Sequence, residues 1–234
     1  MLTIIIPTLD EEAFIGKVLG NLKPQLSAKD EIIVVDSFSK DKTVEIAKRY
    51  GAKVLMQPKV GNGLAKTEGA KKALNDIIVF VDADTEIPKG FAKRIKDHFK
   101  DPNLLFLGGL TLYSSESKAW KFVYDSYSQV IFHLGQANHA ITKECYVPPN
   151  NSAFRKNVFL KAGGYRSVVC EDADLMRRLP RSKQIKYDSN LTLTLSDRRF
   201  KSNGFFRTVG LWTWGNISLM LGRKVSSEEY KEGY

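Results

Sequence analysis

Apolar and polar positions over the first hundred residues predict short strands separated by helices. The strand-like segments are apolar runs rich in β-branched residues, and they lie at 2–7, 31–36, 53–56 and 77–81. Apolar residues predominate in each run without alternating with polar ones, which is typical of strands that are buried on both faces. The pattern therefore predicts an α/β fold, with a mostly parallel central sheet flanked by helices.

The segments between these runs carry helix signals. Thr8 and Glu11 have the spacing of a capping box, which predicts the start of a helix that ends before Pro24. The apolar face of this helix comprises Ile15, Val18, Leu19 and Leu22. A second helix is expected from about Asp41 to a C-terminal cap at Gly51. Its predicted inward positions are Val44, Ala47 and Tyr50. A loop at 61–63 and a helix of small residues to position 74 follow.

The second half of the chain is less regular. One predicted helix has an apolar face made of Trp120, Tyr124, Tyr127, Ile131 and Leu134. After a break at 148–152, the sequence predicts a strand and a short helix within 153–165, then a helix at 171–179 and strands at 185–187 and 191–195. Residues 204–221 have the pattern of an amphipathic helix rich in aromatic residues.

Composition narrows the functional classes. The chain has 234 residues, 43% of them apolar, which is enough for a folded core and excludes wholesale disorder. Two cysteines are too few for a disulfide framework, and the sequence shows neither a secretory signal nor a membrane-spanning stretch. A cytoplasmic domain is therefore expected. The net charge is +10 (36 Lys and Arg minus 26 Asp and Glu), which favours nucleotides, nucleic acid or anionic lipid as partners.

Acidic residues follow two of the predicted strands. Asp36 closes the second strand, and Asp82-Ala83-Asp84 follows the fourth. Parallel strands bind ligands at their carboxyl ends, where the first strand also places Pro7 and Thr8. Two carboxylates separated by one residue suit a hard cation such as Mg²⁺ or Mn²⁺. The alternative is that these acids belong to surface turns.

Further along the chain, other charged residues could contribute to a site. Glu171, Asp172 and Asp174 open a predicted helix, where they serve either as dipole caps or as a general base. Arg198 and Arg199 suit a diphosphate, because guanidinium groups bind phosphate bidentately, although such pairs are also common on surfaces. Lys66 is either a phosphate ligand or a solvated helix residue.

Six short motifs, each weak alone, occur in a fixed order. They are Pro7-Thr8-Leu9-Asp10-Glu11, Val-Val-Asp36 with Ser39, Asp41 and Thr43, the segment 63–69, Val-Asp82-Ala83-Asp84-Thr85, Gly163-Gly164-Tyr165, and Glu171-Asp172-Ala173-Asp174-Leu175. Together, over about residues 2–200, they resemble family 2 of the inverting glycosyltransferases with the GT-A fold. The resemblance implies a catalytic domain at 1–200, with a nucleotide-binding half (1–100) and an acceptor-side half (101–200), followed by a helix and tail at 201–234.

The resemblance also implies roles for individual residues. The donor, a UDP-, GDP- or dTDP-sugar, would be contacted by Pro7, Thr8, Glu11, Asp36, Lys66, Asp82, Ala83, Arg198 and Arg199. Asp84 would ligate Mn²⁺ or Mg²⁺ at the diphosphate, with Asp82 near ribose and metal. Asp172 would be the base that deprotonates the acceptor hydroxyl, and Glu171 is its close rival. In-line attack on the sugar would invert its anomeric configuration.

Two departures from the family pattern refine this expectation. Processive members carry Gln-x-x-Arg-Trp, whereas this chain has Ser196-Asp197-Arg198-Arg199-Phe200, which indicates transfer of a single sugar. Typical members have Arg-Asn where this chain has Lys66-Thr67, which makes that nucleotide contact less defined. The chain resembles a small stand-alone member of the family.

The acceptor is expected to be a glycan or a lipid-linked molecule. Trp212 and Trp214, with Arg207, Arg223 and Lys224, fit an interfacial helix, so 204–224 would contact the inner face of a membrane; the alternative is that these aromatic residues only cover the core. Two other functions stay open. A sugar nucleotidyltransferase would need a glycine-rich loop after the first strand, which the sequence lacks. A catalytically silent GT-A-like protein would bind nucleotides or nucleic acid, although no specific nucleic acid is expected.

Overall fold

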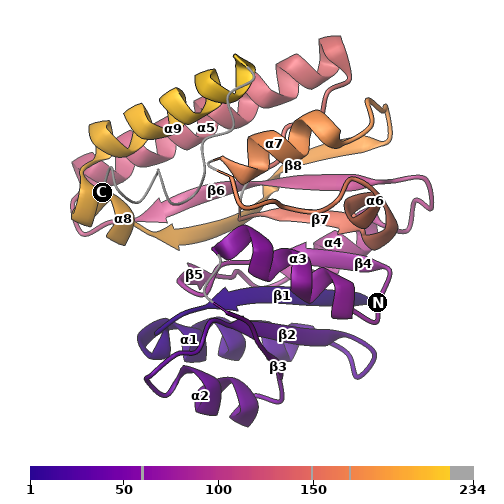
Figure 1. Ribbon diagram of the computed structural model, residues 1–234, viewed down its shortest axis with the longest axis vertical. Helices are drawn as coiled ribbons and strands as arrows, with labels where there is room; N and C mark the ends of the chain where they lie inside the picture. Colours follow the sequence, from indigo (N-terminus) through magenta and orange to yellow (C-terminus); the bar gives the residue numbers. More distant parts are fainter. Residues whose placement is uncertain (59–60, 149, 169, 222–234) are drawn as a thin grey trace.

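The computed structural model describes residues 1–58, 61–148, 150–168 and 170–221. Within these residues eight strands form one sheet, in the order β3-β2-β1-β4-β7-β6-β8-β5, and helices cover it (Figure 1). The predicted α/β class with a mostly parallel sheet is confirmed.

The first half of the chain forms a parallel layer. Its elements are β1 (Leu2–Thr8), α1 (Glu12–Leu22), η1 (Lys23–Gln25), β2 (Glu31–Asp36), α2 (Thr43–Arg49), β3 (Lys53–Met56), α3 (Asn62–Lys72) and β4 (Ile77–Phe80). β1 pairs in parallel with β2 and β4, and β2 pairs in parallel with β3. All four strands therefore end at the same edge of the sheet, as the sequence predicts.

The second half adds antiparallel pairs. Its elements are β5 (Thr85–Glu86), α4 (Phe91–His98), β6 (Phe106–Ser114), α5 (Lys118–Thr142), β7 (Ser152–Arg155), α6 (Lys156–Lys161), α7 (Glu171–Arg178), β8 (Ile185–Ser196), α8 (Arg198–Asn203) and α9 (Phe205–Met220). β7 pairs antiparallel with both β4 and β6, and β6 is parallel to β8. In Figure 1, α5, α7 and α9 lie together next to β6 and β8, at the end of the molecule opposite α1 and α2.

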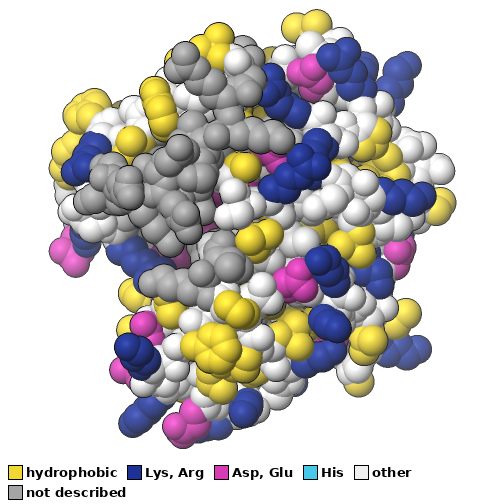
Figure 2. Space-filling model, in the orientation of Figure 1, with side chains coloured by type: hydrophobic (Ala, Val, Ile, Leu, Met, Phe, Trp, Pro, Cys, Tyr) yellow, Lys and Arg dark blue, Asp and Glu magenta, His cyan; other side chains and the backbone are white. Residues whose placement is uncertain are grey.

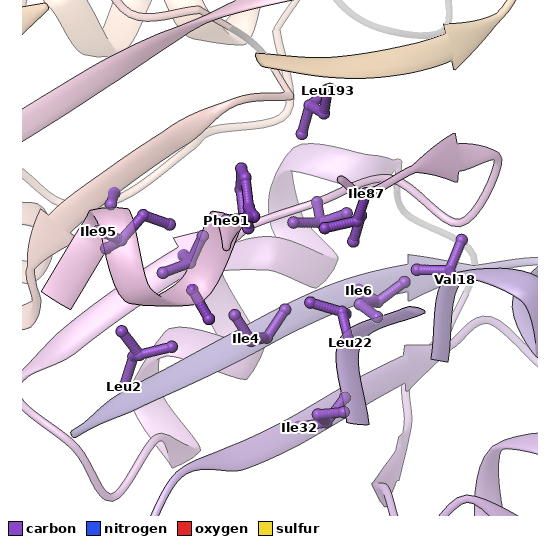
Figure 3. Close-up of a cluster of buried hydrophobic side chains, with 14 of the residues drawn as sticks. Leu2, Ile4, Ile6, Val18, Leu22, Ile32, Ile87, Phe91, Ile95 and Leu193 are labelled. Carbon is purple, nitrogen blue, oxygen red and sulfur yellow. The ribbon is translucent and has the colours of Figure 1, made fainter. Parts of the chain in front are cut away.

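Both faces of β1 are buried, which explains its uninterrupted apolar sequence. Leu2, Ile4 and Ile6 point toward α1 and α4, where they meet the side chains of those helices (Figure 3). Ile5 points to the opposite face and packs beneath α3. A Cβ at Gly69 would lie 2.5 Å from Ile5, so α3 needs a glycine there in order to approach the sheet.

The predicted capping box is wrong. Glu11 occupies the N-cap of α1 without a side-chain cap, and the Thr8 hydroxyl donates a hydrogen bond to Asp36 instead. The exposed N–H groups of α1 are satisfied by the loop after β2: Thr43 accepts from the N–H of Glu11, and Asp41 accepts from that of Glu12. A tertiary contact has replaced the local one, because the two loops meet at the carboxyl edge of the sheet.

Some expected faces and breaks also differ from the structure. Tyr50, predicted to face inward, is 36% exposed. Trp120 and Leu134, predicted to belong to one apolar helix face, are 42% and 60% exposed. The segments 185–187 and 191–195 belong to the single strand β8, whose pairing with β6 contains a register shift after Gly109. The polar residues Asp188, Ser189 and Asn190 interrupt the apolar pattern, which is why the sequence predicts two separate strands. Asp188 is held by an ion pair with Arg94.

Side chains of α9 divide between core and solvent. Phe205 and Trp212 pack against the rings of α5 and α8, whereas Phe206 and Trp214 are 79% and 50% exposed. Among the residues described, none of the helices combines the length and the apolar character needed to cross a membrane.

Candidate active site

The carboxyl ends of β1 and β2 form one wall of the site. Thr8 and Asp36 end these strands in register, and the Thr8 hydroxyl donates to Asp36 Oδ2 at 2.8 Å. Ser39 donates to the same carboxylate through its N–H (2.8 Å) and its hydroxyl (2.6 Å). Asp36 is fully buried, and three hydrogen bonds fix its orientation. It is a rigid hydrogen-bond acceptor at the carboxyl edge of the sheet, where ligands of parallel α/β folds bind.

Arg198 connects two acids that lie far apart in the sequence. Its guanidinium donates to both oxygens of Glu11, at 2.9 and 2.5 Å, and its Nε lies 2.8 Å from Asp84 Oδ2. Glu11 is buried, and the Asp84 side chain is only 9% exposed. The cation therefore holds two carboxylates that would otherwise repel each other.

Burial is the main perturbation of Asp84. It raises the pKa of this carboxyl from 3.8 to about 6, and the charges of Asp82 and Glu11 act in the same direction, against the stabilising charge of Arg198. The charged form of Asp84 is disfavoured even though an arginine lies beside it. An additional cation would stabilise that charged form, so the position is suited to one.

Lys66 links α3 to the acidic strand end. It is buried, and its Nζ lies 2.8 Å from Asp82 Oδ1. This contact decides between the two interpretations of the residue, because Lys66 is not a solvated helix lysine. At the start of the same helix, a Cβ on Gly63 would lie 2.8 Å from Glu171 Cγ. Thus α3 is in contact with both the acids after β4 and the first turn of α7.

The first turn of α7 carries the second acidic group. The preceding residue, Cys170, has a left-handed backbone (φ 54°), a strained conformation for a non-glycine residue. Burial raises the pKa of both Glu171 and Asp172. Asp174 differs, because it is ion-paired with Arg178 at 2.6 Å. Two of the three acids are therefore candidates for a base, and the third stabilises the helix.

Three tyrosine hydroxyls lie within electrostatic range of Asp172. Burial raises the pKa values of the Tyr127, Tyr146 and Tyr165 hydroxyls, and the negative charge of Asp172 contributes to each increase. Their rings come from α5 and from the segments before and after β7 and α6, so no periodic pattern predicts that they lie near one acid. Ser39 and Thr43 were recognisable only as parts of a motif. Tyr146 was not identified from the sequence at all.

The structure brings together most of the predicted residues. Pro7, Thr8, Glu11, Asp36, Lys66, Asp82, Ala83, Asp84 and Arg198 lie at or next to the carboxyl edge, and Glu171 and Asp172 adjoin them through Gly63. Arg199 is exposed at the start of α8, and its charge acts on Glu171 and Tyr113. Its positive charge therefore acts on the first turn of α7, where Glu171 lies.

The two acids after β4 fit a divalent cation. Within the described ranges, no cluster of three His, Cys, Asp or Glu side chains is arranged to hold a metal. The chain therefore offers two carboxylates, Asp82 and Asp84. Mg²⁺ is commonly held in this way, by one or two carboxylates together with substrate phosphates.

Comparison with known proteins gives a consistent result. A family model described as glycosyl transferase family 2 matches residues 3–163. Glucosyl-3-phosphoglycerate synthase of Petrotoga mobilis is 43% identical over a segment that covers 36% of this chain and 30% of that protein. The chain spans about a third of the length of the curated relatives it matches.

Solved structures resemble the whole fold. Glucosyl-3-phosphoglycerate synthase from Mycobacterium tuberculosis, in complex with Mn²⁺, UDP and phosphoglyceric acid, has a TM-score of 0.65 at 19% identity, covering 95% of this chain and 78% of that one. Mannosyltransferase PcManGT from Pyrobaculum calidifontis, in complex with GDP-Man and Mn²⁺, has a TM-score of 0.60 at 20% identity, covering 82% and 56%.

Proposed function

The chain belongs to glycosyl transferase family 2 and has the GT-A fold, and we propose that it transfers one sugar from a nucleotide-sugar donor to an acceptor hydroxyl or lipid phosphate, with inversion. The observation that carries this proposal is the cluster of Asp82, Asp84, Lys66 and Arg198 at the carboxyl edge of β4. It combines two carboxylates with two cations, which is what a metal-bound diphosphate requires.

The donor would lie across the first four strands. Asp36, held by Thr8 and Ser39, accepts hydrogen bonds from the nucleoside, and Pro7, Glu11 and the backbone at Ala83 complete the contact. Lys66 and Arg198 direct positive charge toward the diphosphate, and Arg199 joins them from α8. In this division, residues 1–100 bind the nucleotide, residues 101–200 bind the acceptor, and 201–234 form an extension.

Asp82 and Asp84 would hold Mn²⁺ or Mg²⁺ beside the diphosphate. When bound, the cation neutralises charge that develops on the departing diphosphate. In this structure Arg198 is ion-paired with Asp84. When the cation and the donor bind, its guanidinium would turn from that carboxylate to the phosphate oxygens. Glu11 would keep the arginine in place during this change, because it makes two hydrogen bonds with it.

The base is Asp172. Its carboxylate accepts the proton of the acceptor hydroxyl, whose oxygen attacks the anomeric carbon as the bond to the diphosphate breaks. A raised pKa suits this role, because it increases proton affinity. Attack from the side opposite the leaving group inverts the sugar. Ser196 and Phe200 stand where processive relatives carry Gln and Trp, which supports transfer of a single residue.

The alternatives have weaker support. The turn between Pro7 and Glu12 contains no glycine to admit a triphosphate, as a nucleotidyltransferase would need. Lysine and arginine side chains are spread over the described part of the face in Figure 2 rather than gathered in one stripe, so a nucleic-acid partner is not favoured.

A thermal-shift screen tests the donor proposal. UDP-, GDP- and dTDP-sugars are added to the full chain with Mn²⁺ or with EDTA. One nucleotide should raise the melting temperature, with a larger rise in Mn²⁺, because a ligand that binds only the folded state stabilises it. At 100 times its Kd the stabilisation is about 2.7 kcal/mol. Absence of any shift for all three nucleotides would refute the proposal.

Peripheral membrane contact through 204–224 is a further part of the proposal. It is supported by the exposed Phe206, Trp214 and Ile217 on α9. Arg223 and Lys224, which the sequence assigned to the same surface, lie outside the described residues. The membrane contacted would be the inner face of the cytoplasmic membrane.

Co-sedimentation with anionic vesicles tests this contact. The double substitution Phe206→Glu and Trp214→Glu should lower the bound fraction about tenfold or more, because two exposed aromatic side chains no longer enter the lipid interface. Leu74→Glu is the control, since Leu74 is 79% exposed and follows α3 rather than belonging to α9. Equal binding of the wild type and the double variant would exclude this surface.

A further inference from the structure

A cavity of about 610 Å³ lies between α5, α7 and α9. Its lining residues are Gly135, Asn138, Glu144, Cys145, Tyr146, Ala173, Met176, Arg177, Leu179, Arg181, Asn216 and Leu219. The volume lies within the range of small-molecule sites, and water at bulk density would fill it with about 20 molecules. None of these residues belongs to the donor contacts described above.

The walls of the cavity are predominantly apolar. Cys145, Leu179 and Leu219 are buried in them, with Met176 partly buried. The two arginines have partners already, since Arg177 donates to the carbonyl of Leu219 and Arg181 is ion-paired with Glu144. A ligand would therefore gain chiefly from covering apolar surface rather than from neutralising charge.

The cavity adjoins the proposed base. Ala173, which lines it, follows Asp172 in α7, and Tyr146 lines it from the other side. The charge of Asp172 contributes to the raised pKa of the Tyr146 hydroxyl, so the two groups share one environment. Tyr146 lies flat on α5 because Gly135 has no side chain; a Cβ there would lie 2.4 Å from the ring.

The outer surfaces of the two bordering helices are apolar as well. Val130, Leu134 and Ile141 on α5 are 56%, 60% and 83% exposed, and Ile217 on α9 is 50% exposed. The two helices run alongside each other in Figure 1, with ring contacts between Tyr127 and Trp212. An apolar chain could therefore extend from the cavity along this surface, past Arg177 and Arg181, whose guanidinium groups already have partners.

We infer that this cavity is the binding site for the hydrocarbon chain of an amphipathic acceptor, whose hydroxyl or phosphate head lies at Asp172. The inference rests on the proposed function and names the acceptor class: a lipid rather than a small hydrophilic acid or sugar. The chain fills the space between α5, α7 and α9, and the head emerges past Tyr146 and Ala173 toward the donor.

Alkyl glucosides test the chain site directly. Hexyl, heptyl and octyl β-glucoside, below their micelle concentrations, are titrated into the full chain by calorimetry. Each added methylene should lower the Kd about fourfold, which corresponds to about 0.8 kcal/mol per buried CH₂. With the donor identified by the thermal-shift screen, kcat/KM for transfer should rise in the same order.

Two matched variants locate the site. Asn138 lines the cavity and is exposed, so Asn138→Trp narrows its mouth without disturbing the core. Asn216→Trp does the same from α9. Both should abolish the chain-length dependence, whereas Ala137→Trp, an exposed neighbour on α5 that does not line the cavity, should retain it.

The possible results separate the inference from the proposed function. Affinity that is independent of chain length, or equal in all variants, overturns the inference. So does efficient transfer to 3-phosphoglycerate with no gain from alkyl acceptors, and in that case the glycosyltransferase proposal stands. Conversely, chain-length-dependent binding without stabilisation by any nucleotide sugar refutes the proposed donor chemistry and leaves the hydrocarbon site in place.

Discussion

Replacing Asp172 by asparagine is expected to slow sugar transfer by about 10²- to 10⁴-fold while leaving donor affinity nearly unchanged. Asparagine keeps the size of the side chain but cannot accept the acceptor proton. The proposed donor contacts lie on β1, β2, α3 and α8 and after β4. Although α3 contacts the first turn of α7 through Gly63, the substitution keeps the size of the side chain, so the thermal shift produced by donor and Mn²⁺ should persist. Single-turnover transfer and the donor-induced shift, measured on the same protein, check both parts.

The neighbouring acids supply the controls for this experiment. Glu171→Gln tests the rival base, which is also partly buried with a raised pKa. Asp174→Asn tests helix stability, because that acid is paired with Arg178. If Glu171→Gln loses activity and Asp172→Asn keeps it, the assignment of the base must be reversed. Loss of activity in Asp174→Asn alone would indicate a structural cause.

Replacing Asp84 by asparagine is expected to abolish metal-dependent turnover and to stabilise the metal-free fold. The activity is lost because an amide is a poor ligand for Mg²⁺ or Mn²⁺ compared with a carboxylate. The fold is stabilised because burial disfavours the charged form of Asp84, whose pKa rises from 3.8 to about 6. That rise corresponds to about 3 kcal/mol in favour of the neutral acid.

The pH dependence has a definite sign. The folded state binds a proton more tightly at Asp84 than the unfolded state does, so this residue destabilises the fold increasingly as pH rises from about 4 to about 6. Asparagine lacks this penalty, and Arg198 keeps Glu11 as its partner. Urea unfolding in EDTA should therefore show a larger gain for Asp84→Asn at pH 7.5 than at pH 4.5. A variant less stable than wild type at pH 7.5 would contradict this account.

The sequence predicts the first half of the fold well because its signals there are local. The strands β1, β2 and β4 are buried on both faces, so each gives a nearly continuous apolar run, whereas the edge strand β3 is partly exposed. Parallel order then brings Thr8, Asp36 and Asp82 to one edge. The acids therefore could be placed from strand ends alone. The second half combines antiparallel strand pairs with long-range contacts. There the sequence contains no local pattern clear enough to predict β6, α4 or β5.

The features that sequence analysis missed depend on contacts between distant residues. Glu11 and Arg198 are 187 positions apart, yet the guanidinium of the second fixes the carboxylate of the first. Tyr146 packs closely on α5 only because that helix carries Gly135 at the point of contact. Neither contact could be inferred from periodicity, because each depends on how β8 and α5 pack on the completed sheet.

The loops after β1 and β2 are interlocked, which constrains attempts to exchange them between relatives. Ser39 accepts from the N–H of Asp10, and Asp10 accepts in return from the N–H of Lys40; Glu12 and Lys42 make a second return contact. A chimera that imports only one of the two loops would leave hydrogen-bond donors and acceptors of the other loop without partners at the carboxyl edge of the sheet. Donor specificity in this scaffold must therefore be transplanted as a paired cassette, 8–12 together with 36–43.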